Sequence, residues 1–362
     1  MNFWPLPTHV IMEMLFGAVS IAVVLKLLGN GLAGAKENGR KKRLAFLDFA
    51  KGGSILSMIL IHVSNKASAG IVLNDFIWFG VPLFVFCSGY LLMRRYGNGL
   101  EIGSYFRKAF FRVVLPYVIV SLVLHMAAHG WFVNPQELLL DLVFGRLNGY
   151  NLYFIPVMIQ FYLLFPLMAK YRVEILSWAG VMAAFAFSVL MNFEDGLIRQ
   201  PLWNSDLLAL IFFGRYAFYF IFGAYLSRLD FEAVGAGKSA FAALAFAAGT
   251  AALAQFAGSL YLGYLFPILW LFLMHLAYVG GKKLGAGAAW KGIEMLGIFA
   301  LAIYLVHTTI LDSIAPFAEG FFSGWPLYFA LFLLTAIASL LAAAIFMAAY
   351  KLATAKWNAP AG

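Results

Sequence analysis

Charged side chains are scarce in this chain. Only 11% of its 362 residues are Asp, Glu, Lys or Arg, whereas about a quarter are charged in a typical soluble domain. Hydrophobic residues make up 64% of the sequence, and its mean hydropathy is +0.88. The apolar residues form blocks of roughly 18 to 25 residues, a length that crosses a bilayer as a helix. The composition therefore excludes a soluble globular protein and predicts a polytopic helical membrane protein.

Cysteine is nearly absent as well, and the single Cys87 excludes an internal disulfide framework. The sequence also lacks, in any convincing context, the GxGxxG and P-loop patterns of nucleotide-binding proteins, the GxSxG of hydrolases and CxxC pairs. The net charge of +9 comes from short basic clusters between apolar blocks. A nucleic-acid binder needs instead a basic face with stacking or base-reading residues. We therefore expect a lipid bilayer, and no nucleic acid, as a partner.

Eleven apolar segments are predicted to span the membrane, so the expected fold class is an all-α polytopic transmembrane bundle. The segments are 9–34, 45–65, 76–93, 113–132, 151–169, 174–193, 206–227, 239–256, 258–280, 293–313 and 326–350. Clusters of basic residues follow the odd-numbered segments, so they all lie on one side of the membrane. The loops on the other side contain only three basic residues, Lys66, Arg146 and Arg199. The clusters include Lys36, Arg40, Lys41, Lys42, Arg43, Arg94, Arg95, Arg107, Lys108, Arg112, Lys170, Arg172, Arg228, Lys238, Lys282, Lys283, Lys291, Lys351 and Lys356. This bias predicts an N-terminus outside and a C-terminus in the cytoplasm.

The first segment is read as a retained span rather than a signal peptide. Residues 1–14 contain no Lys or Arg and do contain Glu13, whereas a signal peptide begins with a positively charged region. The outer segment 135–149 is amphipathic, and it is read as an interfacial helix, with a plain solvated loop as the alternative.

The second segment carries Asp48, Lys51 and His62 within apolar sequence. An ionisable residue inside a span is costly unless it faces a cavity or a partner, so it is a functional candidate by default. Lys51 and His62 lie about 16 Å apart along a helix, which suggests a cation near one membrane face and a proton acceptor deep in the span, joined by a channel. We interpret His62 as a general base; a plain hydrogen bond to a neighbouring helix is the alternative.

Asp48 and Lys51 are spaced i, i+3, so they can pair with each other and bind nothing else. The nearby basic residues Lys108 and Arg112 can likewise serve as topology determinants. The same density of positive charge would suit an anionic phosphate ligand that enters from the cytoplasm. Both interpretations stay open and are compatible. Ser88 is expected at the depth of Lys51, where it would line the entrance.

Three further candidates are weighed against plain packing. Cys87 is not expected to pair with His62, because the two would lie about 9 Å and about 25 Å from the cytoplasmic ends of their helices. His125 and His129 share a helical face, but no third His or Cys ligand is evident, so a structural or acceptor-binding role is favoured over a metal site. Tyr304 and His307 share a face in the tenth segment, where an active-site wall is slightly favoured over packing.

The order of these motifs resembles the acyltransferase 3 family of integral membrane acyltransferases. The family's first core helix reads roughly Leu-Asp-x-x-Arg-Gly followed by a histidine, and Leu47, Asp48, Lys51, Gly52 and His62 match it with lysine in place of arginine. Later matches are Pro82-Leu83-Phe84 with Ser88-Gly89-Tyr90-Leu91, Arg112 to Pro116, Leu152 to Pro156 with Gln160-Phe161-Tyr162 and Pro166, Phe220 with Gly223, and Ile303 to His307. The family's Arg-x-x-Arg pattern in the basic loop is not intact, because Ala109 stands three residues before Arg112 where the first arginine is expected, and Lys108 is the candidate substitute.

The resemblance implies a ten-span acyltransferase core at 43–350, preceded by an extra helix and basic loop at 1–42 and followed by a tail at 351–362. It implies acyl-CoA, most often acetyl-CoA, as a co-substrate, with no permanently bound cofactor and no metal. A glycan or lipid-linked hydroxyl would be the acceptor. Under this reading His62 and Asp48 are catalytic, and Lys51, Ser88, Lys108 and Arg112 bind acyl-CoA. The acceptor or cavity residues are Tyr153, Tyr162, Tyr304 and His307.

The expected location is the bacterial inner membrane. The rival interpretation is a transporter or flippase for a lipid-linked glycan or amphiphile, which would use the same cavity without chemistry. Inverted repeats with paired broken helices would favour that class, and no such internal symmetry is evident in the sequence.

Overall fold

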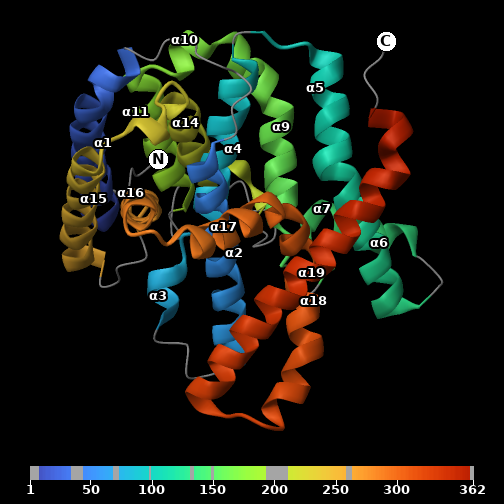
Figure 1. Ribbon diagram of the computed structural model, residues 1–362. Coiled ribbons are helices and arrows are strands. Elements are labelled where there is room, and N and C mark those ends of the chain that lie inside the picture. Colours follow the sequence, from blue (N-terminus) through green and yellow to red (C-terminus); the bar gives the residue numbers. More distant parts are fainter. Residues whose placement is uncertain are drawn as a thin grey trace, which may run out of the picture.

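The computed structural model describes residues 8–33, 44–67, 73–97, 99–130, 134–147, 151–192, 211–257 and 263–358. Within these ranges the chain forms helices and no strands (Figure 1). The helices are α1 (Thr8–Ala33), α2 (Ala45–Lys66), α3 (Asn74–Ile77), α4 (Gly80–Tyr96), α5 (Ile102–Ala109), η2 (Phe110–Val114), α6 (Leu115–His129), α7 (Pro135–Phe144), α9 (Phe154–Lys170), α10 (Arg172–Ile175), α11 (Trp178–Asn192), η3 (Phe213–Tyr216), α14 (Ala217–Leu226), η4 (Phe231–Ala233), α15 (Ala236–Ala257), α16 (Leu265–Lys283), α17 (Gly287–Ile298), α18 (Ala300–Glu319) and α19 (Gly324–Asn358). The predicted basic cluster 36–43 and Arg199 lie outside the described residues.

Seven helical stretches in the described part of the chain are long and apolar enough to cross a membrane. They are Thr8–Leu28, Ala45–Lys66, Ile102–His129, Ala236–Gln255, Leu265–Lys283, Ala300–Glu319 and Gly324–Thr354, and two shorter apolar helices are Phe154–Lys170 and Trp178–Met191. The predicted all-α polytopic bundle is confirmed. The count of eleven spans stays a prediction.

Helix α2 lies at the centre of the bundle. It packs against α4, α16, α17, α18 and α19, and 67% of its most apolar window is buried, compared with 22% for α19. On one side of the molecule α1 packs against α15, and α18 and α19 form a long hairpin that extends at the bottom of the view (Figure 1). A central helix with many neighbours is the most rigid support that this bundle offers for polar side chains.

Helix α17 crosses α2 at very close range through two glycines. A Cβ atom added at Gly52 of α2 would clash with the carbonyl oxygen of Ile293, and one added at Gly297 of α17 would clash with the carbonyl oxygen of Asp48. Small residues allow two membrane helices to bring their backbones together in this way. The glycine that follows Lys51 in the sequence motif therefore exists to admit α17.

Helices α4 and α14 use the same device. A Cβ atom at Gly89 would meet the carbonyl oxygen of Phe220, and a Cβ atom at Gly223 would meet the carbonyl oxygen of Phe86. The reciprocal contact explains why glycine follows Ser88 and why glycine stands three residues after Phe220. It also fixes the height and rotation of α4, which carries Ser88.

The segment predicted as one span at 293–313 is divided in the structure. Helix α17 ends at Ile298, Phe299 adopts φ −93° and ψ 6°, and α18 starts at Ala300 in a new direction. The physical reason is the close crossing: α17 lies across α2, whereas α18 continues along the bundle (Figure 1). The uninterrupted apolar sequence gave no signal for this break.

Candidate active-site cavity

A cavity of about 950 Å³ opens between the N-terminal half of α2, α4, the α5–η2 segment, α9 and the junction of α17 with α18. Its described lining residues are Leu44, Leu47, Asp48, Lys51, Phe84, Ser88, Leu91, Leu92, Arg94, Arg95, Tyr96, Tyr105, Lys108, Ala109, Arg112, Val113, Phe154, Ile155, Met158, Tyr162, Gly297, Ile298, Ala300, Leu301 and Tyr304. A volume of this size lies at the upper end of the range for small-molecule and cofactor sites.

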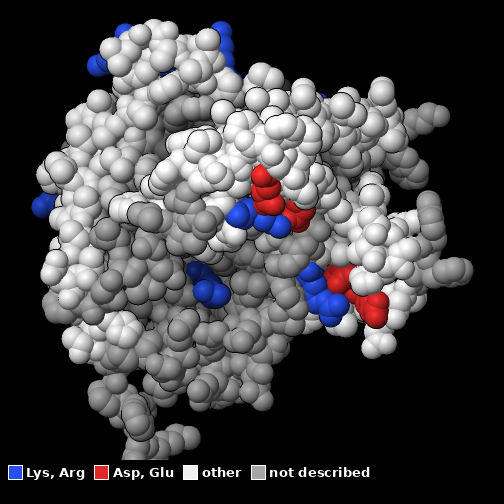
Figure 2. Space-filling view, turned by 90° about the horizontal axis from the view of Figure 1, so that it is seen from below, with Lys and Arg blue, Asp and Glu red and all other residues white. Residues whose placement is uncertain are grey.

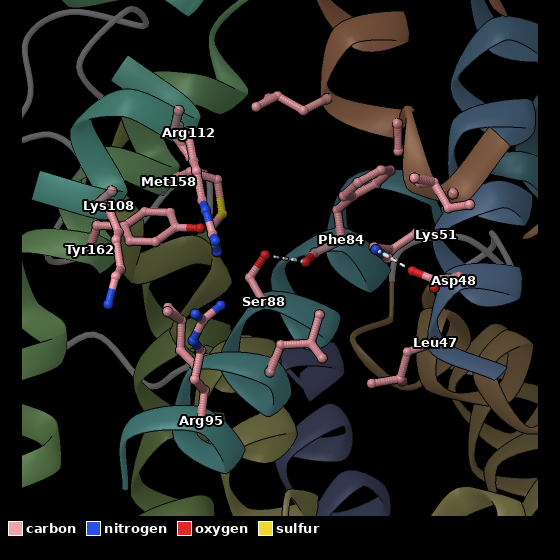
Figure 3. A pocket seen from close by; sticks show the side chains of 18 of the residues that line it. Leu47, Asp48, Lys51, Phe84, Ser88, Arg95, Lys108, Arg112, Met158 and Tyr162 are labelled. Carbon is pink, nitrogen blue, oxygen red and sulfur yellow. Dashed lines mark hydrogen bonds and ion pairs between the residues drawn. The ribbon is translucent and has the colours of Figure 1, made fainter. Parts of the chain in front are cut away.

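The lining is strongly cationic. It contains the side chains Lys51, Arg94, Arg95, Lys108 and Arg112, and Asp48 is the one acidic residue among the described lining residues. In the close-up view the guanidinium groups of Arg95 and Arg112 point toward one another across the cavity, with Ser88 nearby (Figure 3). Such a cluster in a membrane-embedded site is suited to a multiply charged anion.

Helix α2 holds Asp48 and Lys51 in its first two turns. The N–H of Phe46 donates to the Glu232 carboxylate at 3.2 Å, which satisfies part of the helix start. Asp48 lies in the first turn, where the helix dipole favours a negative charge. The Lys51 ammonium lies 2.7 Å from the Asp48 carboxylate, with 20% and 13% of the two side chains exposed. The predicted pair is present, and it lines the cavity.

Arg112 belongs to a five-residue π-helical turn, η2, between α5 and α6. Such turns change the direction of side chains along an otherwise continuous helix and occur often at functional sites. The Tyr105 hydroxyl donates to the Tyr162 carbonyl oxygen at 2.9 Å, which ties α5 to α9 across this side of the cavity. Lys108, Arg112 and Tyr162 thus line one wall, opposite Lys51 (Figure 3).

Tyr304 lies at the inner end of the cavity and is fixed by two hydrogen bonds. Its hydroxyl donates to the carbonyl oxygen of Asn151 and accepts the N–H of Phe154 at 3.3 Å. Its ring contacts that of His307 at 5.7 Å between centroids. The His307 ring in turn lies 5.1 Å from that of His62 on α2. The rings of Tyr304 and His307 therefore connect the cavity with the predicted base.

Residues 44–344, which are most of the chain and include every lining residue of the cavity, match the family described as an acyltransferase domain. The chain belongs to the acyltransferase 3 family. It is a membrane acyltransferase, which decides against a transporter or flippase as its class. No curated protein and no solved structure shows significant similarity to it. Helix α1 precedes the matched residues.

The cavity of the acyltransferase brings together all four residues predicted to bind acyl-CoA. Lys51, Ser88, Lys108 and Arg112 all line it, as do Asp48, Tyr162 and Tyr304. The Ser88 hydroxyl donates to the Phe84 carbonyl oxygen at 2.8 Å. This bond turns the hydroxyl back to its own helix, as is common for serine in apolar helices.

Three predicted site residues are not among the described residues that line this cavity: His62, Tyr153 and His307. His62 is half-buried and His307 is fully buried. The described lining of the cavity includes Lys51 but not His62, so the expected channel between them stays a prediction. Cys87 is fully buried and also absent from the described lining.

Two arginines of the site were assigned only to membrane topology by the sequence. Arg94 donates to the Tyr90 hydroxyl at 2.8 Å, and the Arg95 guanidinium lies 5.3 Å from the centre of the Tyr96 ring. A usable signal existed for Arg95, which stands seven residues after Ser88. That spacing places both side chains on one helical face.

Proposed function

We propose that the acyltransferase moves an acyl group, acetyl in the simplest case, from acyl-CoA to a hydroxyl of a glycan or lipid-linked acceptor. The observation that carries the proposal is the cationic cavity whose inner end connects through Tyr304 and His307 to His62. Acyl-CoA combines several phosphate groups with a long, uncharged thioester arm. Such a donor requires a site with a charged mouth for its phosphates and an apolar inner end for its thioester arm.

The phosphates of the donor would bind at the charged mouth. Arg95 and Arg112 approach each other across the cavity and offer planar forks that can bind phosphate oxygens in pairs. Lys51 and Lys108 add point charges, and Asp48 orients the Lys51 ammonium. The apolar residues Phe84, Ile155 and Leu301, and others of the lining, would accompany the arm toward Tyr304.

His62 would act as the general base. It removes the proton from the acceptor hydroxyl as the oxygen attacks the thioester carbonyl, and it then returns the proton to the departing thiolate of coenzyme A. The acyl group passes directly between the substrates, so no acyl-enzyme bond is formed. His307, in ring contact with His62, would position the imidazole.

The acceptor would approach His62 from the end of α2 opposite the cationic cavity. At that end Lys66 lies 2.7 Å from Asp312 of α18, and about half of each side chain is exposed. Among the described residues, the view from below shows charged side chains in a few small groups (Figure 2).

The basic residues of the cavity mouth would face the cytoplasm of a bacterium, by the positive-inside rule. Lys51, Arg94, Arg95, Lys108 and Arg112 all lie at this end. The N-terminus would then be outside and the C-terminus inside. Acyl-CoA, which is made in the cytoplasm, would reach the cavity directly.

The decisive experiment measures label transfer from radiolabelled acetyl-CoA to a glycolipid extract of the host by the purified protein. The wild type is compared with His62→Ala and with His9→Ala, which removes a histidine of α1 outside the cavity. Transfer by the wild type and His9→Ala, but not by a folded His62→Ala, supports the proposal. Full activity of His62→Ala contradicts its role as the base, and no transfer by the wild type contradicts acetyl-CoA as the donor.

A further inference from the structure

A second group of polar side chains lies outside the cationic cavity, where the end of α6 meets α7. It consists of His125 and His129 on α6 and Asp141 on α7. One ligand atom from each of the three residues lies within 4.8 Å of the others. None of the three is among the described residues that line the cavity, and the proposed acyl transfer does not use them.

The contacts of His125 have an unusual form. Its Nδ1 atom lies 2.8 Å from the Asp141 carboxylate, while its Nε2 atom is buried and has no hydrogen-bond partner among the described residues. The His125 side chain is fully buried. An imidazole nitrogen and a carboxylate oxygen this close together can become two ligands of one metal ion. Buried polar atoms otherwise find partners almost without exception.

Hydrogen bonds within and between α6 and α7 hold His125 and Asp141 in place without a metal ion. The Asn134 side chain caps the start of α7 by accepting the N–H of Gln136 at 3.0 Å. The Tyr117 hydroxyl donates to the Leu142 carbonyl oxygen at 2.8 Å, which fixes α7 on α6. Asp141 is 3% exposed and faces α6. The site is therefore preformed on its buried side.

His129 is the adjustable member. It stands one helical turn after His125, its ring centroid lies 4.7 Å from that of His125, and its side chain is exposed. The ligand atoms of a tetrahedral zinc site lie about 3.4 Å apart, because each is about 2.1 Å from the metal. The ligand atoms of the three residues lie up to 4.8 Å apart in the structure. Because the His129 side chain is exposed, it can turn inward and shorten this distance at little cost in packing.

We propose that His125, His129 and Asp141 bind a divalent transition-metal ion, for which zinc is the best match. Two imidazoles and one carboxylate suit zinc, whereas magnesium and calcium prefer sites made of oxygen alone. Three protein ligands leave a fourth position for water or a substrate oxygen. Arg146 donates to Oδ1 of Asp141 at 3.1 Å, and the metal ion would take the place of the proton between Oδ2 of Asp141 and Nδ1 of His125.

The test is zinc binding to the purified protein in detergent, after removal of any purification tag and treatment with a chelator. The affinity is measured by competition with a coloured zinc indicator, in the absence of any acyl donor. We compare the wild type with His129→Ala, chosen because this exposed side chain contributes little to packing. Glu137→Gln is the matched control, because it removes an exposed carboxylate of α7 outside the group.

We expect one zinc ion per wild-type chain, equal binding by Glu137→Gln, and affinity at least about 100-fold lower for His129→Ala. Zinc should raise the melting temperature of the wild type and of Glu137→Gln, but not that of His129→Ala. Cobalt bound to the wild type should show the strong visible absorption of a four-coordinate site. Failure of the wild type to bind zinc, or equal binding by His129→Ala, would overturn the proposal and leave a plain His125–Asp141 ion pair.

Discussion

The imidazole rings of His62 on α2 and His307 on α18 lie 5.1 Å apart between their centroids, at an angle of 55°. Because Nδ1–H of His307 donates to the Tyr304 carbonyl oxygen at 2.8 Å, its ring orientation is fixed. A fixed ring against His62 limits the directions in which the proposed base can point.

His307→Ala should therefore lower the kcat of acyl transfer by about 10- to 100-fold and leave the KM for acyl-CoA nearly unchanged. The reason is that His307 contacts Tyr304 but is not among the described lining residues of the cavity in which the donor is proposed to bind. His62→Ala should lower kcat further, by about 100- to 10,000-fold, as expected for loss of a general base. Steady-state kinetics with labelled acetyl-CoA separates the two effects. A His307 variant with raised KM and normal kcat would place His307 in donor binding instead.

Gly52→Ala should destabilise the protein by about 1–3 kcal/mol or more, because the new methyl group would displace the α17 backbone at Ile293. Gly292→Ala on α17 is the control, since a Cβ atom there meets nothing within 4 Å. The control should be neutral or slightly stabilising, as alanine favours helix. Thermal unfolding in detergent measures both variants. Equal melting temperatures would show that the crossing is looser than described.

Arg112→Ala and Arg95→Ala should each weaken coenzyme A binding by about 10- to 150-fold, which corresponds to loss of about 1.5–3 kcal/mol for hydrogen bonds to a charged group. Lys283→Ala removes an exposed cation at the end of α16, outside the cavity, and should leave affinity unchanged. Isothermal titration calorimetry with coenzyme A measures all three. Wild-type affinity in both arginine variants would exclude the cavity as the donor site.

Tyr304→Phe should cost about 1–3 kcal/mol of stability, because the carbonyl oxygen of Asn151 and the N–H of Phe154 lose their shared partner. The ring is retained, so the cavity keeps its shape and coenzyme A should bind as in the wild type. Melting temperature and calorimetry together test this separation. Unchanged stability combined with lost coenzyme A binding would assign the hydroxyl to the ligand instead of the fold.

The sequence was sufficient for features that depend on neighbours along one helix. The spacing of Asp48 and Lys51 predicted their pairing, and the lengths of the apolar blocks predicted the helical bundle. Arg95 was accessible in principle, because its spacing from Ser88 places it on the same face of α4. The distribution of basic residues across the membrane already explained its charge, so the sequence analysis did not assign Arg95 to the cavity that it lines.

Features that depend on contacts between distant helices were out of reach. The ring contacts of His307 with Tyr304 and with His62 join residues of α2 and α18 that are more than 240 positions apart, so they exist only after the helices pack. The break at Phe299 follows from the crossing of α17 over α2, which no local signal encodes. Asp141 could not be linked to His125, because the partner of a histidine on α6 had to come from a different helix.

Tyr304 lines the cationic cavity and contacts His307, and its hydroxyl is held by the Asn151 carbonyl oxygen and the Phe154 N–H. Under the proposed function, the phosphates of coenzyme A stay in the cavity, and the thioester passes Tyr304 to meet the acceptor hydroxyl at His62. Only the acyl group is then delivered to the acceptor on the outer side of the membrane. Such an enzyme is at once a catalyst and a vectorial export route, and it modifies an outer surface without releasing coenzyme A from the cell.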